Sequence, residues 1–154
     1  MVKLFEYLSE SPRQTRKLGE LLASRHLKWK RRKKALVFGL RGDLGGGKTT
    51  FLQGFAKGLG IKEKILSPTF VILKRFKLSN CTIAQFSNFY HIDCYRIRKP
   101  KEILELGFKE IISSPQNIVA VEWAERIKKI MPRGNISIEF SFINEKKRKI
   151  EVFR

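Results

Sequence analysis

Residues 42–49 read Gly-Asp-Leu-Gly-Gly-Gly-Lys-Thr, which fits the pattern G-x-x-x-x-G-K-[ST] of a phosphate-binding P-loop. In such a loop the glycines let the backbone curl, so that successive N–H groups point into one concavity and can hold phosphate oxygens. Lys48 can reach the β- and γ-phosphates of a nucleotide, and the hydroxyl of Thr49 is placed to bind Mg²⁺. The pattern therefore predicts a nucleotide site.

The simplest alternative is a flexible glycine turn that fits this pattern by chance. Glycine makes up about 7% of average sequence, so the fixed positions coincide by chance in on the order of one chain per few hundred of this length. Here an apolar run, residues 35–38, precedes the loop, and Phe51, Phe55 and Leu59 follow it at helical spacing. A strand before the loop and a helix after it make a chance match rarer, so we favour the nucleotide site.

Two acidic residues end other apolar runs. Asp93 follows residues 90–92, and Glu122 follows residues 118–121. A P-loop ATPase needs a carboxylate opposite the Ser or Thr of the loop to hold Mg²⁺, directly or through water, and a group that orients the attacking water. Either acid can serve, and the alternative for each is a solvated surface acid. We favour the functional role for Glu122.

Three further residues lie close to predicted strands. Thr69 follows Pro68, where a hydroxyl can sense the γ-phosphate as in a switch loop, although Ser-Pro-Thr is also an ordinary turn. His91 alternates within a strand and is expected to be a packed or surface histidine rather than a ligand. For Trp123, a place in the core is a sufficient explanation.

Strands and helices alternate along the chain, and this order predicts an α/β fold with a parallel core and antiparallel additions. Ligands in such sheets bind beyond the carboxyl ends of the strands, where both acids are expected. The last two strands are predicted to form a C-terminal hairpin. The expected helices cover residues 12–26, 48–59, 101–112 and 124–130, and the expected strands cover residues 3–8, 35–41, 71–76, 86–92, 117–121, 136–140 and 149–153.

The composition is that of a globular protein. At 154 residues with 42% hydrophobic and 31% charged residues, the chain is expected to form a single domain, residues 1–154. No apolar run approaches the roughly 20 residues of a membrane span, and the first residues lack a secretory signal. Cys81 and Cys94 form no C-x-x-C pair, so reduced thiols in a cytoplasmic protein are expected.

The net charge is unusually high. Thirty-three Lys and Arg residues against fourteen Asp and Glu give +19, and such a field attracts polyanions, of which nucleic acid is the obvious candidate. Residues 28–34 place six cations around Trp29, which suits phosphate contacts and stacking. The alternatives are an exposed loop at residues 28–34 and a lineage in which all proteins are lysine-rich. For residues 28–34 we favour the exposed loop, whereas the sequence does not decide between the two explanations of the net charge.

Taken together, these segments resemble the TsaE (YjeE) family, the small bacterial ATPases of tRNA threonylcarbamoyladenosine biosynthesis. The resemblance runs from about Thr15 to Pro132, in order and approximate spacing. Its blocks after the loop are more specific than the P-loop itself. They are Ser67-Pro68-Thr69-Phe70, His91-Ile92-Asp93-Cys94-Tyr95-Arg96, Leu106-Gly107-Phe108 and Glu122-Trp123-Ala124-Glu125.

The resemblance implies a P-loop NTPase fold, a three-layer sandwich, with slow Mg²⁺-dependent ATP hydrolysis. It also implies an accessory role with the proteins TsaD and TsaB, which place threonylcarbamoyl on the tRNA adenosine beside the anticodon. When the roles known in the family are assigned to the matching positions, the resemblance implies that Lys48 holds phosphates and that Thr49 and Glu122 bind Mg²⁺. Asp93 supports the metal and the water, and Thr69 belongs to the switch segment.

The same resemblance implies which residues contact ATP. Thr15, in the first helix, matches a position near the base. The expected P-loop contacts are Asp43, Leu44, Gly45, Gly46, Gly47, Lys48, Thr49 and Thr50. The basic segment 28–34 and the basic C-terminal hairpin depart from the family pattern, and they leave open whether tRNA is contacted directly or only through the partners.

Other functions remain as alternatives. A GTPase would need an Asn-Lys-x-Asp motif that reads the base, and the sequence has none. A small-molecule P-loop kinase would be expected to carry an arginine-rich lid, and no segment is long enough to assign as one. A basic nucleic-acid-binding module with a vestigial ATP site is the non-enzymatic alternative.

Overall fold

The computed structural model describes residues 1–26, 32–66, 71–79 and 86–154. Its strands are β1 (Lys3–Ser9), β2 (Leu36–Gly42), β3 (Leu73–Lys77), β4 (Asn88–Asp93), β5 (Asn117–Glu122), β6 (Ile136–Phe142) and β7 (Arg148–Phe153). Its helices are α1 (Pro12–His26), α2 (Lys48–Gly58), α3 (Pro100–Glu105), α4 (Phe108–Ser113) and the 3-10 helix η1 (Ala124–Ile130).

The strands form one seven-stranded mixed sheet in the order β1-β7-β6-β2-β5-β4-β3. Its four central strands, β6, β2, β5 and β4, are parallel to one another. Strands β1 and β7 extend one side of the sheet and β3 the other, all by antiparallel pairing. The parallel core and the antiparallel C-terminal hairpin confirm the fold predicted from the sequence.

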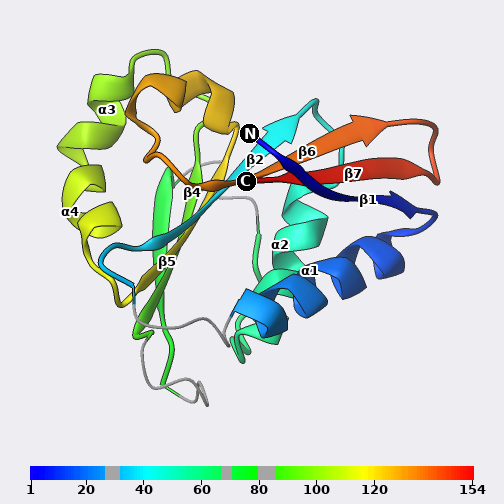
Figure 1. Ribbon diagram of the computed structural model, residues 1–154, viewed down its shortest axis with the longest axis horizontal. Coiled ribbons are helices and arrows are strands. Elements are labelled where there is room, and N and C mark those ends of the chain that lie inside the picture. Colours follow the sequence, from blue (N-terminus) through cyan, green and yellow to red (C-terminus); the bar gives the residue numbers. More distant parts are fainter. Residues whose placement is uncertain (27–31, 67–70, 80–85) are drawn as a thin grey trace.

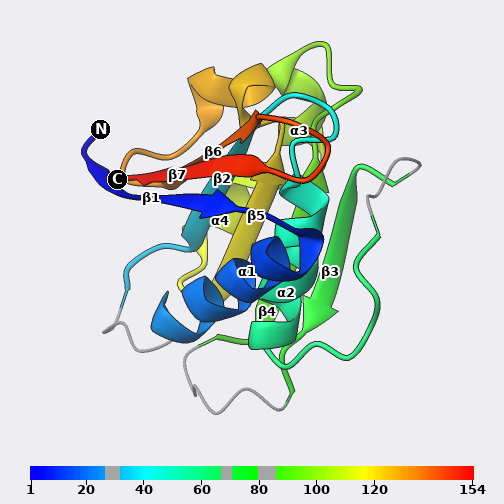
Figure 2. The same ribbon diagram turned by 90° about the vertical axis from the view of Figure 1, so that its right-hand side faces the viewer.

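Helices cover both faces of the sheet. Figures 1 and 2 show α1 and α2 on one face and α3, α4 and η1 on the other. Side chains along a strand point alternately to the two faces. Phe38 and Leu40 of β2 therefore join the core beneath α2, whereas Val37 joins the core beneath α3 and α4. The sheet is thus the middle of three layers.

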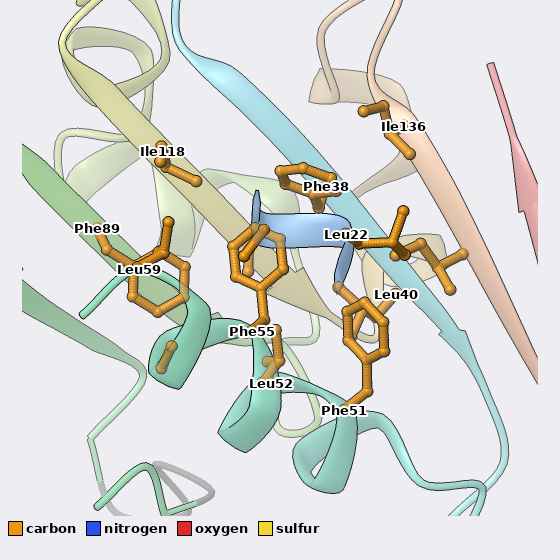
Figure 3. Packing of buried hydrophobic residues seen from close by; sticks show 14 of the residues in the cluster. Leu22, Phe38, Leu40, Phe51, Leu52, Phe55, Leu59, Phe89, Ile118 and Ile136 are labelled. Carbon is orange, nitrogen blue, oxygen red and sulfur yellow. The ribbon is translucent and has the colours of Figure 1, made fainter. Parts of the chain in front are cut away.

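The core on the α2 side is aromatic. Phe51 and Phe55 project from α2 toward the sheet (Figure 3). The ring of Phe55 lies 4.8 Å from the ring of Phe38 in an edge-on arrangement, and 5.9 Å from the ring of Phe89 on β4. Edge-on aromatic pairs stabilise by about 0.5–1.5 kcal/mol beyond the area that they bury. This packing fixes α2 against β2 and β4, and so fixes the loop that leads into α2.

The helices α1 and α2 touch through their backbones. A Cβ atom on Gly54 would lie 1.8 Å from the carbonyl oxygen of Arg16, and one on Gly19 would lie 2.2 Å from the carbonyl oxygen of Phe51. Only glycine permits this approach, because any side chain would overlap the opposite backbone.

We expect the substitution Gly54→Ala to destabilise the protein. The added methyl group must push α1 and α2 apart, and overpacking of this kind costs about 1–3 kcal/mol. Urea unfolding of Gly54→Ala measures the change, with Lys57→Ala as the control because Lys57 is an exposed residue of the same helix. A gain of about 1 kcal/mol, as alanine gives in an unobstructed helix, would show that the two helices are not in contact.

Several local expectations are confirmed. The helical segment that begins near residue 101 breaks at Gly107, whose φ of 82° lies in the left-handed region, and Gly60 follows the end of α2 with a φ of 79°.

Thr69 and Trp29 lie outside the described residues. Within the ranges given above, no helix is long and apolar enough to cross a membrane.

Candidate functional site

The P-loop connects the end of β2 to the start of α2, as expected. Gly47, which precedes the first residue of α2, has a φ of 100°, a conformation that favours glycine. At Gly42 a Cβ atom would lie 2.1 Å from the carbonyl oxygen of Phe140 on β6, so the loop also needs a residue without a side chain there. The N-terminus of α2 consequently opens into the concavity of the loop, an arrangement that favours an anion.

The ammonium group of Lys48 lies inside this loop. It donates hydrogen bonds to the carbonyl oxygens of Gly42 and, at 2.8 Å, of Asp43. Its Nζ also lies 4.0 Å from the centroid of the Trp123 ring. Burial lowers the pKa of the Lys48 side chain, and nearby carboxylates, that of Glu122 foremost, oppose this shift. A buried ammonium next to a helix N-terminus is suited to bind phosphate.

The hydroxyl of Thr49 faces Glu122. Its Oγ1 lies 3.1 Å and 3.2 Å from the two carboxylate oxygens of Glu122, the last residue of β5. The carboxylate also accepts a hydrogen bond at 2.8 Å from Nε2 of His91 on β4. Both the His91 and the Glu122 side chains are buried. Three elements, α2, β4 and β5, therefore converge on one carboxylate.

Strand register brings the second acid to the same edge. Asp93, the last residue of β4, pairs with Glu122 in the parallel β4–β5 ladder. An Asp93 carboxylate oxygen accepts a hydrogen bond at 2.9 Å from the backbone N–H of Tyr95. Both acids therefore end strands, as the sequence predicted, and the structure adds that these two strands are parallel neighbours.

A pocket of about 390 Å³ joins these groups, which is the size of a typical small-molecule site. Its walls include the P-loop and the start of α2, residues 44–50, together with Asp93 and Glu122. Of the predicted loop contacts, Asp43 is the one that does not line the pocket. Its contribution is the carbonyl oxygen that accepts a hydrogen bond from Lys48.

The start of α1 and the β6–β7 hairpin also line the pocket. Thr15 of α1 lines it, and its hydroxyl lies 2.7 Å from the hydroxyl of Ser9 on β1. Beside the start of α1, the β6–β7 hairpin contributes Lys146 and Arg148, and the neighbouring Lys147 pairs with Glu10 at 3.1 Å. The position implied for Thr15, beside the bound base, is compatible with its place in the pocket.

Sequence reasoning missed the part played by the hairpin. Arg148 donates from Nε to the carbonyl oxygen of Gly45 in the P-loop at 2.9 Å, and its guanidinium lies 4.5 Å from the centroid of the Phe142 ring. The contact ties the end of the chain to the P-loop. The sequence shows that the hairpin is basic, but nothing local in the sequence indicates that the hairpin packs beside the P-loop.

Trp123 has the one non-glycine positive φ within the described residues, 58°, at the turn between β5 and η1. Such a conformation is unusual for a bulky residue and concentrates at functional sites. Its ring lines the pocket between Lys48 and Tyr95, whose ring centroid is 5.2 Å away. Trp123 is therefore a wall of the site rather than a core residue alone.

Cys94 lies beside this site but is chemically protected. It is fully buried, and burial raises the pKa of its thiol to about 12. Because the thiolate is the reactive form, we expect Cys94 to react with iodoacetamide at pH 8 on the order of a thousandfold more slowly than an exposed thiol. Mass spectrometry of a Cys81→Ser variant, native and unfolded in urea, measures this. Rapid native labelling would show that the β4–β5 edge opens.

The donor groups at the pocket suit Mg²⁺ bound together with a nucleotide. Among the residues described here, no three His, Cys, Asp or Glu side chains cluster closely enough to hold a metal ion by themselves. Nucleotide-bound Mg²⁺ usually takes only one or two protein carboxylates and completes its shell with phosphate oxygens and water. One hydroxyl and one carboxylate in contact, Thr49 and Glu122, with Asp93 alongside, fit this requirement.

A family model and two relatives found by comparison with known proteins all carry the name TsaE. The family model of TsaE, "Threonylcarbamoyl adenosine biosynthesis protein TsaE", matches residues 9–150. A Rickettsia felis protein named tRNA threonylcarbamoyladenosine biosynthesis protein TsaE is 38% identical over 136 residues, which are 88% of this chain and 71% of that protein. A Bacillus subtilis protein of the same name is 33% identical over 149 residues, 97% of this chain and 85% of the relative.

A solved structure shares the fold. The crystal structure of Bacillus subtilis YdiB superposes with a TM-score of 0.74 at 30% sequence identity, covering 99% of this chain and 86% of YdiB. The superposition therefore includes α1 and the β6–β7 hairpin as well as the P-loop.

Proposed function

Since the chain belongs to the TsaE family, which acts in tRNA threonylcarbamoyladenosine biosynthesis, we propose that it is a Mg²⁺-dependent ATPase serving this modification. The observation that carries the proposal is the convergence of Lys48, Thr49 and Glu122 on one pocket beside the N-terminus of α2. A phosphate-binding loop alone would support nucleotide binding. A carboxylate in contact with the loop hydroxyl supports hydrolysis as well.

Binding is proposed to begin with an exchange of partners at Lys48. Its ammonium moves from the carbonyl oxygens of Gly42 and Asp43 to the β- and γ-phosphate oxygens. A phosphate oxygen carries a negative charge, whereas a carbonyl oxygen is neutral, so the ammonium group binds the phosphate more strongly and the exchange favours the bound nucleotide. The backbone N–H groups of residues 44–50 hold the remaining phosphate oxygens, and Thr15 lies at the base.

The metal is proposed to be held by the hydroxyl of Thr49 and the carboxylate of Glu122, with Asp93 in support. When bound, Mg²⁺ neutralises the charge that develops on the phosphate oxygens. Asp93 is also proposed to orient the attacking water, and Thr69 to belong to a segment that senses the γ-phosphate. Trp123 excludes bulk water from the side of the pocket that faces Lys48.

We propose TsaD and TsaB as the protein partners and the cytoplasm as the site of action. ATP hydrolysis would then support threonylcarbamoyl transfer to the tRNA adenosine beside the anticodon. The charge of +19 favours proximity to tRNA during the cycle, whether contact is direct or made through the partners.

The test is reconstitution of the modification. Purified TsaD, TsaB and unmodified tRNA are supplied with an activated threonylcarbamoyl donor, with and without this chain, and modified adenosine is measured by mass spectrometry over several turnovers. We expect multiple turnovers only when the chain and ATP are both present. Modification that proceeds equally without the chain would contradict the proposal.

A further inference from the structure

We propose that His91 is a positioning residue that orients the carboxylate of Glu122 toward the metal–nucleotide complex. The inference rests on the proposed function, because it assigns Glu122 to that complex. It concerns a side chain that the nucleotide does not reach, since His91 is absent from the residues that line the pocket.

Strand geometry places His91 directly behind Glu122. Phe89, His91 and Asp93 alternate on β4 and share the face that packs toward α2, and on β5 the same face carries Ala120 and Glu122. His91 pairs in register with Ala120, one step before Glu122 on that face. Its imidazole therefore reaches the carboxylate along the face of the sheet, from β4, whereas the Thr49 hydroxyl reaches it from α2.

The hydrogen bond fixes one carboxylate oxygen. A carboxylate only accepts hydrogen bonds, so the network assigns the proton to Nε2 of His91, 2.8 Å from Oε1 of Glu122. With Oε1 engaged, the carboxylate cannot rotate freely about its last bond. Oε2, which lies 3.1 Å from the Thr49 hydroxyl, is thereby held on the side of the P-loop.

The burial of this pair indicates a role beyond packing. His91 is 1% exposed and Glu122 is 2% exposed. Burying such a pair often costs as much as it returns, and apolar residues of similar volume commonly stabilise a core at least as well. The neighbours on the same face, Phe89 and Ala120, are apolar. Partners that orient metal-binding side chains typically contribute 10–100-fold to metal affinity, which gives this pair a function.

The experiment compares nucleotide binding with and without Mg²⁺. Calorimetry measures the affinity for a non-hydrolysable ATP analogue, first in EDTA and then in saturating Mg²⁺, for wild type, His91→Gln and His91→Leu. Glutamine keeps an N–H donor of similar reach, whereas leucine removes it. We expect His91→Leu to bind the metal-free analogue within about 2-fold of wild type and to lose about 10–100-fold of the Mg²⁺-dependent gain. His91→Gln should recover most of that gain.

The matched control is Asn88→Leu. Asn88 and Asn117 form a side-chain hydrogen bond of 3.0 Å between the same two strands, at the end away from the pocket. Its loss should lower thermal stability while leaving both affinities unchanged. If His91→Leu does not fold, His91→Asn takes its place, because its shorter donor cannot reach Glu122.

Two results would overturn the inference. Equal loss of affinity with and without Mg²⁺ would mean that His91 only supports the fold, and an unchanged Mg²⁺-dependent gain would mean that Glu122 needs no orientation. Both presuppose that the wild type binds the analogue with a gain from Mg²⁺. A wild type that does not bind at all would instead contradict the proposed function.

Discussion

Replacing Lys48 with alanine is expected to lower the affinity for ATP by about 10²–10⁴-fold. The ammonium group is the one buried cation among the described residues that line the pocket, and no other lining cation can take its place between the phosphates. Each hydrogen bond to a charged group contributes about 1.5–3 kcal/mol, and Lys48 is expected to make two of them. Titration calorimetry with ATP and Mg²⁺ measures the loss.

The control for this substitution is Lys57→Ala. Lys57 lies in the last turn of α2 and is exposed, so its removal changes the net charge equally without touching the pocket. The thermal unfolding temperature of Lys48→Ala should stay close to that of wild type, because the substitution also removes the cost of burying an ammonium group. Unchanged ATP affinity in Lys48→Ala would contradict the assignment of the P-loop as a nucleotide site.

Replacing Glu122 with alanine is expected to abolish Mg²⁺-dependent turnover while largely preserving binding of the metal-free nucleotide. Glu122 contacts the Thr49 hydroxyl, but Lys48 and the loop N–H groups, which we propose hold the phosphates, remain in place. Loss of a metal-binding carboxylate removes several kcal/mol of transition-state stabilisation, so kcat should fall on the order of 10²-fold or more. Steady-state release of phosphate, measured over a range of Mg²⁺ concentrations, tests this.

Glu125→Gln is the matched control, since Glu125 is an exposed acid on the same turn beyond β5. It should retain both turnover and the Mg²⁺ optimum of the wild type. Full turnover in Glu122→Ala would move the metal to Asp93, the acid paired with Glu122 across the β4–β5 ladder.

Much of this site was predictable because its parts are local or follow from strand direction. The P-loop is a contiguous pattern whose strand and helix can be read from the flanking apolar residues. Asp93 and Glu122 were predictable as a pair because parallel strands bring their carboxyl ends to one edge of a sheet. Neither inference requires knowledge of which strands are neighbours.

The remaining contacts depend on tertiary structure. His91 could be expected to be packed, but its contact with Glu122 follows only from the β4–β5 register. Arg148 and Gly45 are 103 residues apart, and they meet because β6 pairs with β2 and carries the hairpin to the P-loop. The hydrophobic periodicity of a single segment indicates neither the His91–Glu122 contact nor the Arg148–Gly45 contact. The roles expected of Thr69 and of residues 28–34 stay predictions.

The two C-terminal strands also show how the fold completes a site from distant parts. β7 pairs with both β6 and β1, so the hairpin and the start of α1 lie side by side, and both line the pocket. Backbone hydrogen bonds between Val2 and Arg154 join the two ends of the described chain beside this ladder. This part of the pocket therefore depends on antiparallel pairing that the loop motif does not indicate.

ATP hydrolysis by the purified chain is the most direct test of the central claim. It is measured alone and then with TsaD, TsaB and tRNA, with Lys48→Ala as the blank in each case. We expect turnover that is low for the chain alone, rises when the partners are added and is absent from the blank. Phosphate transferred to a small molecule instead of water, or turnover indifferent to the partners, would contradict an ATPase coupled to tRNA modification.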